Sequence, residues 1–237
     1  MKYYIPNQHG AWAMLIIPFL FGIIASAPDL VHILLFACWL LIYLLMFAVL
    51  QWVRTKKTKL YRKPILVYTL LLIPFALWLV LLRPVIVVLA LLFVPLFFVN
   101  AFYAKQKRER ALVNDIAAII QFSIMVFISF RMGEGTDYGL AVKLFLISLL
   151  YFVGTAFYVK TIIREKNNKR FYYYSIVYHI VLLVLSFCLL PWVTAIAAAV
   201  LLLRAIYFPR IGITVKQAGI SEIICSVIVL VSVWMMM

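Results

Sequence analysis

Long apolar runs recur along the whole sequence, and short segments rich in Lys and Arg separate them. Hydrophobic residues make up 68% of the 237 residues, whereas charged residues make up 12%. Soluble domains do not approach this composition, and a bilayer core of roughly 30 Å takes about 20 apolar residues per helix. The sequence therefore predicts an all-α fold, a polytopic membrane helical bundle that forms a single transmembrane domain over residues 1–237.

Nine apolar segments are the predicted membrane helices. Charge clusters, prolines and glycines separate them. They cover residues 11–27, 30–52, 65–82, 85–103, 116–130, 140–160, 172–190, 192–208 and 217–236. Long basic connections are expected after the second, fourth, sixth and eighth segments, and tight turns after the others.

The basic residues are distributed unevenly among these connections. Of the 22 Lys and Arg residues, 19 fall at the N-terminus and in the four long connections when Arg204 is counted with the last of them. Because loops rich in Lys and Arg stay in the cytoplasm, we expect the N-terminus inside and the C-terminus outside. Retention at the cytoplasmic leaflet also accounts for the formal charge of +15, so no nucleic acid partner is expected.

The three cysteines give no sign of a disulfide framework or a zinc site. Cys38, Cys188 and Cys225 each lie inside an apolar run, and none forms a C-x-x-C pair. We therefore expect them to pack within the bundle. No metal site and no cofactor is predicted.

Five polar side chains lie inside the predicted helices, in the halves near the basic connections: Gln51, Asn100, Gln121, His179 and Glu222. Polar groups are costly within a bilayer, so they indicate either function or pairing. A residue six or seven positions inside a helix lies only about 10 Å deep, which favours a polar cavity open to the cytoplasm. The structural alternatives are interhelical hydrogen bonds for the amides, a satisfied core histidine, and pairing of Glu222 with an Arg or Lys.

The stretch PNQHGAWAM, residues 6–14, is a polar and aromatic cluster at the entry to the first helix. Gln8 and His9 are suited to cap that helix, Trp12 to anchor it at the interface, and Gly10 to admit a close neighbouring helix. As a functional alternative, His9 would be within reach of an anion held by the cytoplasmic loops.

Three motifs resemble those of a known family: PNQHGAWAML near the N-terminus, FYAKQKRERALVND in the middle and YVKTIIREKNNKR two-thirds along. They are similar to the YwiC-like family of bacterial integral membrane proteins, and the resemblance spans most of the chain. It implies a multi-pass protein of the bacterial cytoplasmic membrane, and it implies no particular activity.

A more distant resemblance concerns the layout. Nine spans, a cytoplasmic N-terminus and large cytoplasmic loops after every second span resemble the UbiA superfamily of intramembrane prenyltransferases. The segment FYAKQKRER resembles its tyrosine-then-Lys-Arg segment, and Tyr158 and Arg164 match the tyrosine and arginine around its second aspartate motif. In that superfamily, aspartates after the second and sixth spans bind magnesium, which holds an isoprenyl diphosphate.

The acidic residues of that pattern are missing here. The first loop, FAVLQWVRTKKTKLYRKP, contains no Asp or Glu, and the second has only Glu165. Since divalent cations need clustered carboxylates, the usual magnesium mechanism is not expected. Basic side chains take their place: Arg54, Lys57, Arg62, Arg108, Arg110, Lys160, Arg164 and Arg170. Arg gives bidentate contacts to phosphate, so the expected ligand is an isoprenoid or lipid (di)phosphate, bound without a metal in a basic cavity on the cytoplasmic side.

The predicted substrate-binding residues are Gln8, His9, Trp12, Arg54, Arg62, Asn100, Arg108, Tyr158, Lys160, Arg164, His179 and Glu222. Membrane lipids are the expected partners, and no catalytic residue is predicted. Divergent prenyl transfer without a metal stays open, as does the oligomeric state. Two other functions also stay open: a transporter or flippase for an anionic or lipidic substrate, with Glu222 and His179 as a proton relay, and a noncatalytic membrane assembly subunit.

Overall fold

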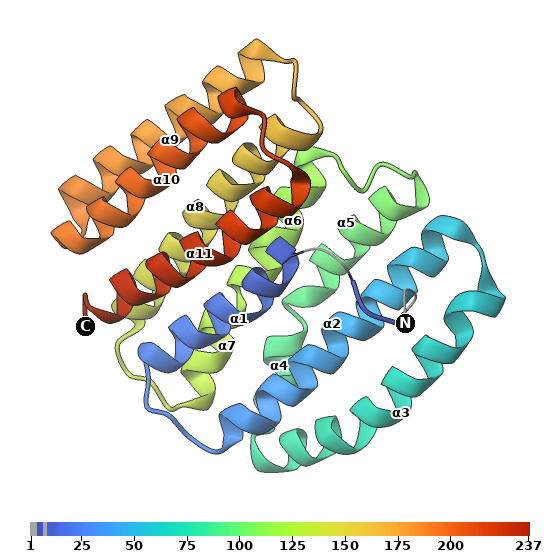
Figure 1. The fold of residues 1–237 in the computed structure, drawn as a ribbon. Coiled ribbons are helices and arrows are strands. Elements are labelled where there is room, and N and C mark those ends of the chain that lie inside the picture. Colours follow the sequence, from blue (N-terminus) through green and yellow to red (C-terminus); the bar gives the residue numbers. More distant parts are fainter. Residues whose placement is uncertain (1–3, 7–8) are drawn as a thin grey trace. The chain divides into compact units, whose positions relative to one another are not determined.

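The computed structural model describes every residue except 1–3 and 7–8, and the side chain of His9 also lies outside the described part. All regular secondary structure among the described residues is helical, as predicted (Figure 1). The helices in chain order are α1 (His9–Ile24), α2 (Val31–Thr55), α3 (Thr58–Leu82), α4 (Ile86–Ala90), α5 (Phe93–Lys105), α6 (Leu112–Ser123), α7 (Met125–Met132), α8 (Tyr138–Ile163), α9 (Lys169–Leu189), α10 (Trp192–Ile211) and α11 (Val215–Trp234).

Eight helical segments of the described chain are long and apolar enough to cross a membrane. Six are the single helices α2, α3, α8, α9, α10 and α11, and two combine short helices, α4 with α5 over Ile86–Lys105 and α6 with α7 over Leu112–Met132. The first predicted segment corresponds to a shorter apolar helix, Gly10–Ile24. The polytopic helical prediction is therefore confirmed, with eight full-length candidate spans and one shorter helix in place of nine equal ones.

The largest difference from the predicted boundaries concerns the first basic connection. The stretch VRTKKTKLYRKP was expected as a long loop, but α2 runs to Thr55 and α3 begins at Thr58. Lys56 has a left-handed backbone with φ of 58°, and its N–H donates to the carbonyl of Trp52. Lys56 thereby caps the C-terminus of α2. The loop prediction was wrong because Lys and Arg favour helices about as strongly as Leu and Met do, so a charge cluster does not by itself end a helix.

Proline explains the break between α4 and α5. Pro95 lies in the first turn of α5, and it has no N–H to donate to the carbonyl of Leu91, four residues earlier. The α-helix is interrupted at Leu91 and Leu92. Backbone N–H groups there donate to carbonyls three residues earlier, as in a 3₁₀-helix. The break therefore lies about one turn before the proline.

The chain divides into two compact units. Unit 1 comprises Met1–Asn7 and Pro18–Phe145, and unit 2 comprises Gln8–Ile17 and Leu146–Met237. Helices α1 and α8 each contribute to both units, and the division of α1 falls at Pro18, which lies inside that helix. Each unit is described by itself, and a single domain over the whole chain stays a prediction.

In unit 1, α2 packs against α3 and α5, and α5 packs against α6. His32, in the first turn of α2, is hydrogen-bonded through both ring nitrogens. Its Nδ1 accepts from the backbone N–H of Asp29 at 3.0 Å, and its Nε2 donates to the carbonyl of Ser129 at 3.0 Å. Arg83 bridges the carboxylates of Asp29 and Glu134 at 3.6 and 2.9 Å. The ionisable side chains of His32, Asp29, Arg83 and Glu134 therefore have structural partners.

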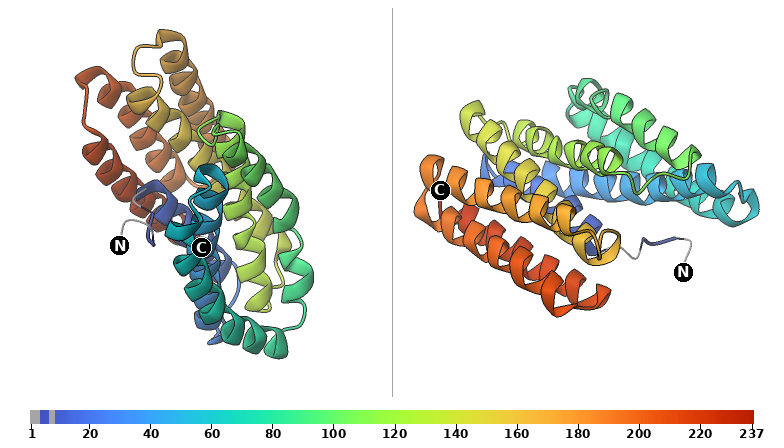
Figure 2. Two further views of the ribbon diagram at one scale, coloured as in Figure 1. Left: turned by 90° about the vertical axis from the view of Figure 1, so that its right-hand side faces the viewer. Right: turned by 90° about the horizontal axis from the view of Figure 1, so that it is seen from above.

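In unit 2, α10 packs against both α9 and α11, and Figures 1 and 2 show α9 and α10 running side by side. Gly212 ends α10 with a left-handed backbone, φ of 69°, which glycine adopts without the steric cost of a Cβ. Thr214 then begins α11 through a capping box with Gln217. Because only three residues separate the two helices, α10 and α11 form an antiparallel hairpin.

Candidate functional site

The hairpin of α10 and α11 brings two ionisable residues to the same depth. Arg204 lies seven residues before the end of α10 at Ile211, and Glu222 lies seven residues after the start of α11 at Val215. At about 1.5 Å per residue, both lie about 10 Å from the turn between the helices. Two opposite charges therefore share one level inside the predicted membrane segments of unit 2.

Arg204 is buried without the partners that a guanidinium needs. The residue is 4% exposed, and its Nε, Nη1 and Nη2 atoms have no hydrogen-bond partner. The thiol of Cys225 interacts with it, but sulfur is a weak acceptor. Leaving buried polar groups unpaired costs about 1–3 kcal/mol each, and more when they are charged. The guanidinium of Arg204 can therefore still donate several hydrogen bonds at this depth.

Tyr158 of α8 forms a platform for this guanidinium. The Cζ atom of Arg204 lies 4.1 Å from the centre of the Tyr158 ring, a cation–π contact. The Tyr158 ring is fully buried, and its hydroxyl hydrogen-bonds to Ser221 Oγ at 2.9 Å. Ser221 in turn donates to the carbonyl of Ala218 at 2.7 Å, which leaves Tyr158 as the donor of the pair. The ring is thus fixed at its polar end, and the guanidinium position is fixed with it.

Glu222 is buried beside Arg204 without pairing with it. The residue is 6% exposed and interacts electrostatically with Arg204, yet the two form no ion pair, so their charged atoms lie more than 4.0 Å apart. A Cβ placed on Gly10 of α1 would lie 2.6 Å from Oε2 of Glu222. The neighbour found at Gly10 is therefore the end of the Glu222 side chain, and close approach of a whole helix there stays a prediction.

His179 of α9 is the third polar group of this region. It is 1% exposed, and its Nδ1 donates to the carbonyl of Ser175 at 2.7 Å, whereas Nε2 has no partner. A Cβ on Gly154 of α8 would lie 3.3 Å from Nε2, so α8 packs closely there. His179 also interacts electrostatically with Arg204. The structural alternative of a fully satisfied core histidine therefore holds for one ring nitrogen only.

We call Arg204, Glu222, His179 and Tyr158 the buried polar cluster. The sequence predicts three of its members as site residues, whereas Arg204 falls among the charges assigned to the last basic connection. The signal was present, because the predicted segment 192–208 contains Arg204, and an ionisable residue inside a membrane segment indicates function by default. Of the remaining predicted residues of unit 2, Trp12 is half-buried in α1, Lys160 is buried in the last turn of α8, and Arg164 is exposed. Gln8 and the side chain of His9 lie outside the described residues.

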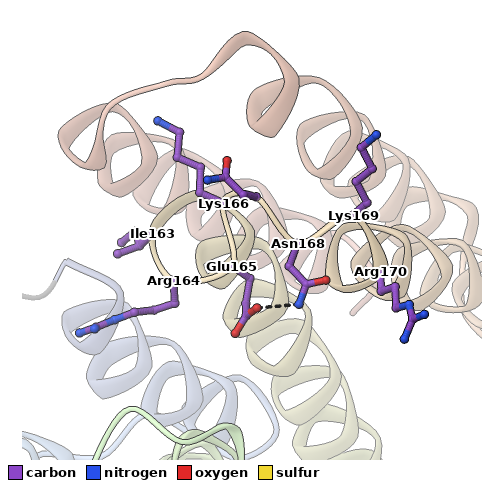
Figure 3. Close-up of a pocket in the computed structure, with 8 residues that line it drawn as sticks. Ile163, Arg164, Glu165, Lys166, Asn168, Lys169 and Arg170 are labelled. Atoms are coloured by element: carbon purple, nitrogen blue, oxygen red, sulfur yellow. Dashed lines mark hydrogen bonds between the residues drawn. The ribbon is translucent and has the colours of Figure 1, made fainter.

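The basic connection between α8 and α9 forms an open hollow lined by residues 163–170 (Figure 3). Figure 3 shows Arg164 and Arg170 pointing in opposite directions, with Lys166 and Lys169 directed outward from the loop. Asn168 donates to Glu165 at 2.8 Å. Its side chain also accepts from the N–H of Phe171 and so caps the N-terminus of α9. These contacts order the loop and start the next helix, but they direct no group of cations at a common point.

The predicted residues of unit 1 have structural partners or lie at the surface. Arg54 pairs with Glu109 at 3.0 Å, and Asn100 donates to Gln121 at 3.0 Å, as the interhelical alternative predicted. Arg62 and Arg108 are exposed. Convergence of the basic side chains on one cytoplasmic mouth stays a prediction.

The magnesium site of the UbiA superfamily does not fit the acidic residues of this chain. Glu165, the one acid of the second loop, is hydrogen-bonded to Asn168, and Glu109 pairs with Arg54. Within the described residues, no three His, Cys, Asp or Glu side chains gather around a common point. A hard divalent cation needs clustered oxygens, and these acidic side chains do not provide them.

Comparison with known proteins gives the family. The pattern of the family described as YwiC-like protein matches residues 5–130. The protein YwiC of Bacillus subtilis (strain 168), described as uncharacterized, is 39% identical over 224 residues, which is 94% of both chains. An uncharacterized protein of Haemophilus influenzae is 29% identical over 222 residues, which is 94% of this chain and 93% of the relative. No solved structure matches the chain. The chain belongs to the YwiC-like family.

Proposed function

We propose that this membrane protein binds a phosphate-bearing lipid or isoprenoid in unit 2, with the phosphate on Arg204 and the apolar tail among the membrane helices. One observation carries the proposal: Arg204 is 4% exposed, and none of its three guanidinium nitrogens has a hydrogen-bond partner.

A phosphate suits this guanidinium better than most anions. The planar fork of Arg presents parallel N–H groups that match two phosphate oxygens, and such charge-assisted bonds are about twice as strong as neutral ones. Tyr158 holds the guanidinium plane from one side, which lowers the entropy lost on binding. The phosphate oxygens would accept hydrogen bonds from the guanidinium, so binding would offset the desolvation cost of burying Arg204.

The depth of Arg204 favours a ligand that enters from the bilayer. The residue lies about 10 Å inside α10, a helix with the length and composition of a membrane span. A headgroup attached to an apolar tail reaches that depth without desolvating the whole molecule, because the tail stays among apolar side chains.

For the membrane and orientation, we propose the bacterial cytoplasmic membrane with the N-terminus in the cytoplasm and the C-terminus outside. The relatives from two bacteria support the first part. With Arg204 placed inside α10, 18 of the 22 basic residues still fall at the N-terminus or near the same helix ends, which supports the second. These surface charges would attract anionic headgroups toward the buried site.

Binding to purified variants tests the proposal. Native mass spectrometry and thermal shifts would be recorded with phosphatidic acid and with an isoprenyl diphosphate. We expect Arg204→Gln to weaken binding of the phosphate ligand by about tenfold or more, and Arg204→Lys to recover part of it, since Lys keeps the charge but not the fork.

Arg210→Gln is the matched control, because Arg210 lies on the same helix but is exposed, with its Cζ atom 5.8 Å from the ring of Tyr172. Equal binding by wild type and Arg204→Gln, with both proteins folded, would overturn the proposal.

A second candidate function, flipping of a lipid between leaflets, is favoured by the buried carboxyl group of Glu222 on α11 and the unpartnered Nε2 of His179 on α9. Polar side chains inside membrane segments mark pathways as well as sites. Proteoliposomes with a fluorescent phospholipid distinguish the two functions: accelerated flipping that Glu222→Gln abolishes supports flipping, whereas Arg204-dependent binding without flipping supports a binding protein.

A further inference from the structure

Two buried charges of opposite sign face one region of unit 2 without neutralising each other. Arg204 and Glu222 lie at equal depth on adjacent antiparallel helices and interact electrostatically, but they form no ion pair. Opposite charges this close inside a membrane protein normally pair directly, because separate burial of each is costly. Their separation therefore needs an explanation.

Packing holds the two groups apart. The Arg204 guanidinium lies over the Tyr158 ring at 4.1 Å, and the hydrogen bond from Tyr158 to Ser221 fixes that ring. The Glu222 carboxylate packs against the backbone of α1 at Gly10, where even a Cβ would lie 2.6 Å from Oε2. Each charged group thus has its own contacts, so the region holds one hydrogen-bond donor group and one acceptor group that are not paired with each other.

We infer that the ligand of this site is zwitterionic: a phospholipid whose phosphate binds Arg204 and whose primary ammonium group binds Glu222. The inference rests on the phosphate binding proposed above and adds the second half of the headgroup. An ethanolamine headgroup has this composition, with two carbons and an ester oxygen between the phosphate and the amine.

The charge balance of the site supports a zwitterion over a more anionic ligand. Arg204 and Glu222 together carry no net charge, and neither does a phosphoethanolamine group. The extra negative charge of a phosphatidic acid or an isoprenyl diphosphate would instead face the Glu222 carboxylate, and like charges in an interface are repelled. A choline headgroup is also zwitterionic, but its nitrogen carries no N–H and so offers Glu222 no hydrogen bond.

Competition among matched ligands provides the test. Purified protein would be titrated with phosphatidylethanolamine, phosphatidic acid and phosphatidylcholine of the same short acyl chains, and with soluble phosphoethanolamine. We expect wild type to prefer the ethanolamine lipid over the other two by about tenfold or more, since charged hydrogen bonds are the strong ones. Glu222→Gln should lower that preference to about threefold or less, and Arg204→Gln should weaken binding of all three lipids.

Glu165→Gln is the matched control, because it makes the same chemical change in the loop before α9, where Glu165 contacts Asn168. It should leave the preference unchanged. Suppose that binding depends on Arg204 but that the ethanolamine lipid and phosphatidic acid bind with equal affinity. That result would overturn the inference of a zwitterionic ligand but not the proposed phosphate site. Lipid binding that Arg204→Gln does not weaken would overturn both the phosphate site and the zwitterionic ligand. Equal affinity for soluble phosphoethanolamine and its lipid would overturn the assignment to a lipid.

Discussion

The two histidines buried in the two units differ in their hydrogen bonding. His32 of unit 1 is 4% exposed, and both of its ring nitrogens bond to backbone groups. His179 of unit 2 is 1% exposed, and its Nε2 has no partner. Both lie in apolar segments, and the sequence predicts only His179 as a site residue because it lies deeper inside its segment. His32 therefore stabilises the start of α2, whereas His179 has a free ring nitrogen in the region of Arg204.

The arginines of the two units differ in the same way. Arg83 of unit 1 lies between the carboxylates of Asp29 and Glu134, and Arg54 pairs with Glu109. Arg204 of unit 2 is far more buried and has no such partner. Satisfied polar groups contribute to stability, whereas unsatisfied ones persist where a ligand completes them. This contrast supports the proposal that the ligand site lies in unit 2, and single substitutions can test it.

The largest expected effect compares two glycines of α1. A Cβ on Gly22, in unit 1, would lie 2.5 Å from the carbonyl oxygen of Val126 and 2.8 Å from the backbone nitrogen of Phe130. A backbone cannot move aside locally, so Gly22→Ala should lower the free energy of unfolding by about 3 kcal/mol. A Cβ on Gly10, in unit 2, would meet only the end of the Glu222 side chain.

Gly10→Ala should therefore cost less stability than Gly22→Ala, about 1 kcal/mol, but should change ligand binding because it displaces the carboxylate. Denaturant or thermal unfolding in detergent measures the first effect, and lipid titration measures the second. Equal destabilisation by the two substitutions would contradict the flexible contact assigned to Gly10.

The next effect compares the two histidines directly. His32→Leu leaves the carbonyl of Ser129 and the N–H of Asp29 without their partner, so we expect it to lower the free energy of unfolding by about 2 kcal/mol. His179→Leu removes one hydrogen bond to Ser175 but also an unpaired nitrogen, so a change within about 1 kcal/mol is expected. Thermal unfolding of the two variants side by side checks this, and a larger loss at His179 would reverse the roles given to the two rings.

Much of the fold follows from the sequence, because the bilayer imposes long apolar helices and the composition reports them directly. The helix breaks follow less well. Pro95 predicts the break before α5. The helices on both sides of Lys56 are not predicted, because a cluster of Lys and Arg does not by itself mark a helix end. Local pattern gives element type, and tertiary packing adjusts the boundaries.

The site was only partly predictable, for a physical reason. Glu222, His179 and Tyr158 stand out as polar or motif residues within or beside apolar runs, but pairing decides their role, and pairing depends on which helices meet. Arg204 was counted with the loop charges because it lies near a basic helix end. Asn100 stood out equally well in sequence and is an interhelical hydrogen-bond partner of Gln121.

The smallest expected effect compares Arg204 with Arg83 in the absence of ligand. Arg204→Met replaces a buried unpaired charge by an apolar chain of similar length, so the free energy of unfolding should rise by about 1 kcal/mol. Arg83→Met removes a half-exposed pair with Glu134, and such pairs contribute a few tenths of a kcal/mol, so that variant should be slightly less stable.

Thermal unfolding of delipidated protein measures both arginine variants, and adding the phosphate lipid should then stabilise Arg83→Met but not Arg204→Met. A clear decrease in the free energy of unfolding of Arg204→Met without ligand would mean that the guanidinium is already paired within the fold. A residue that weakens the empty protein and is needed only when the ligand is present is retained for binding.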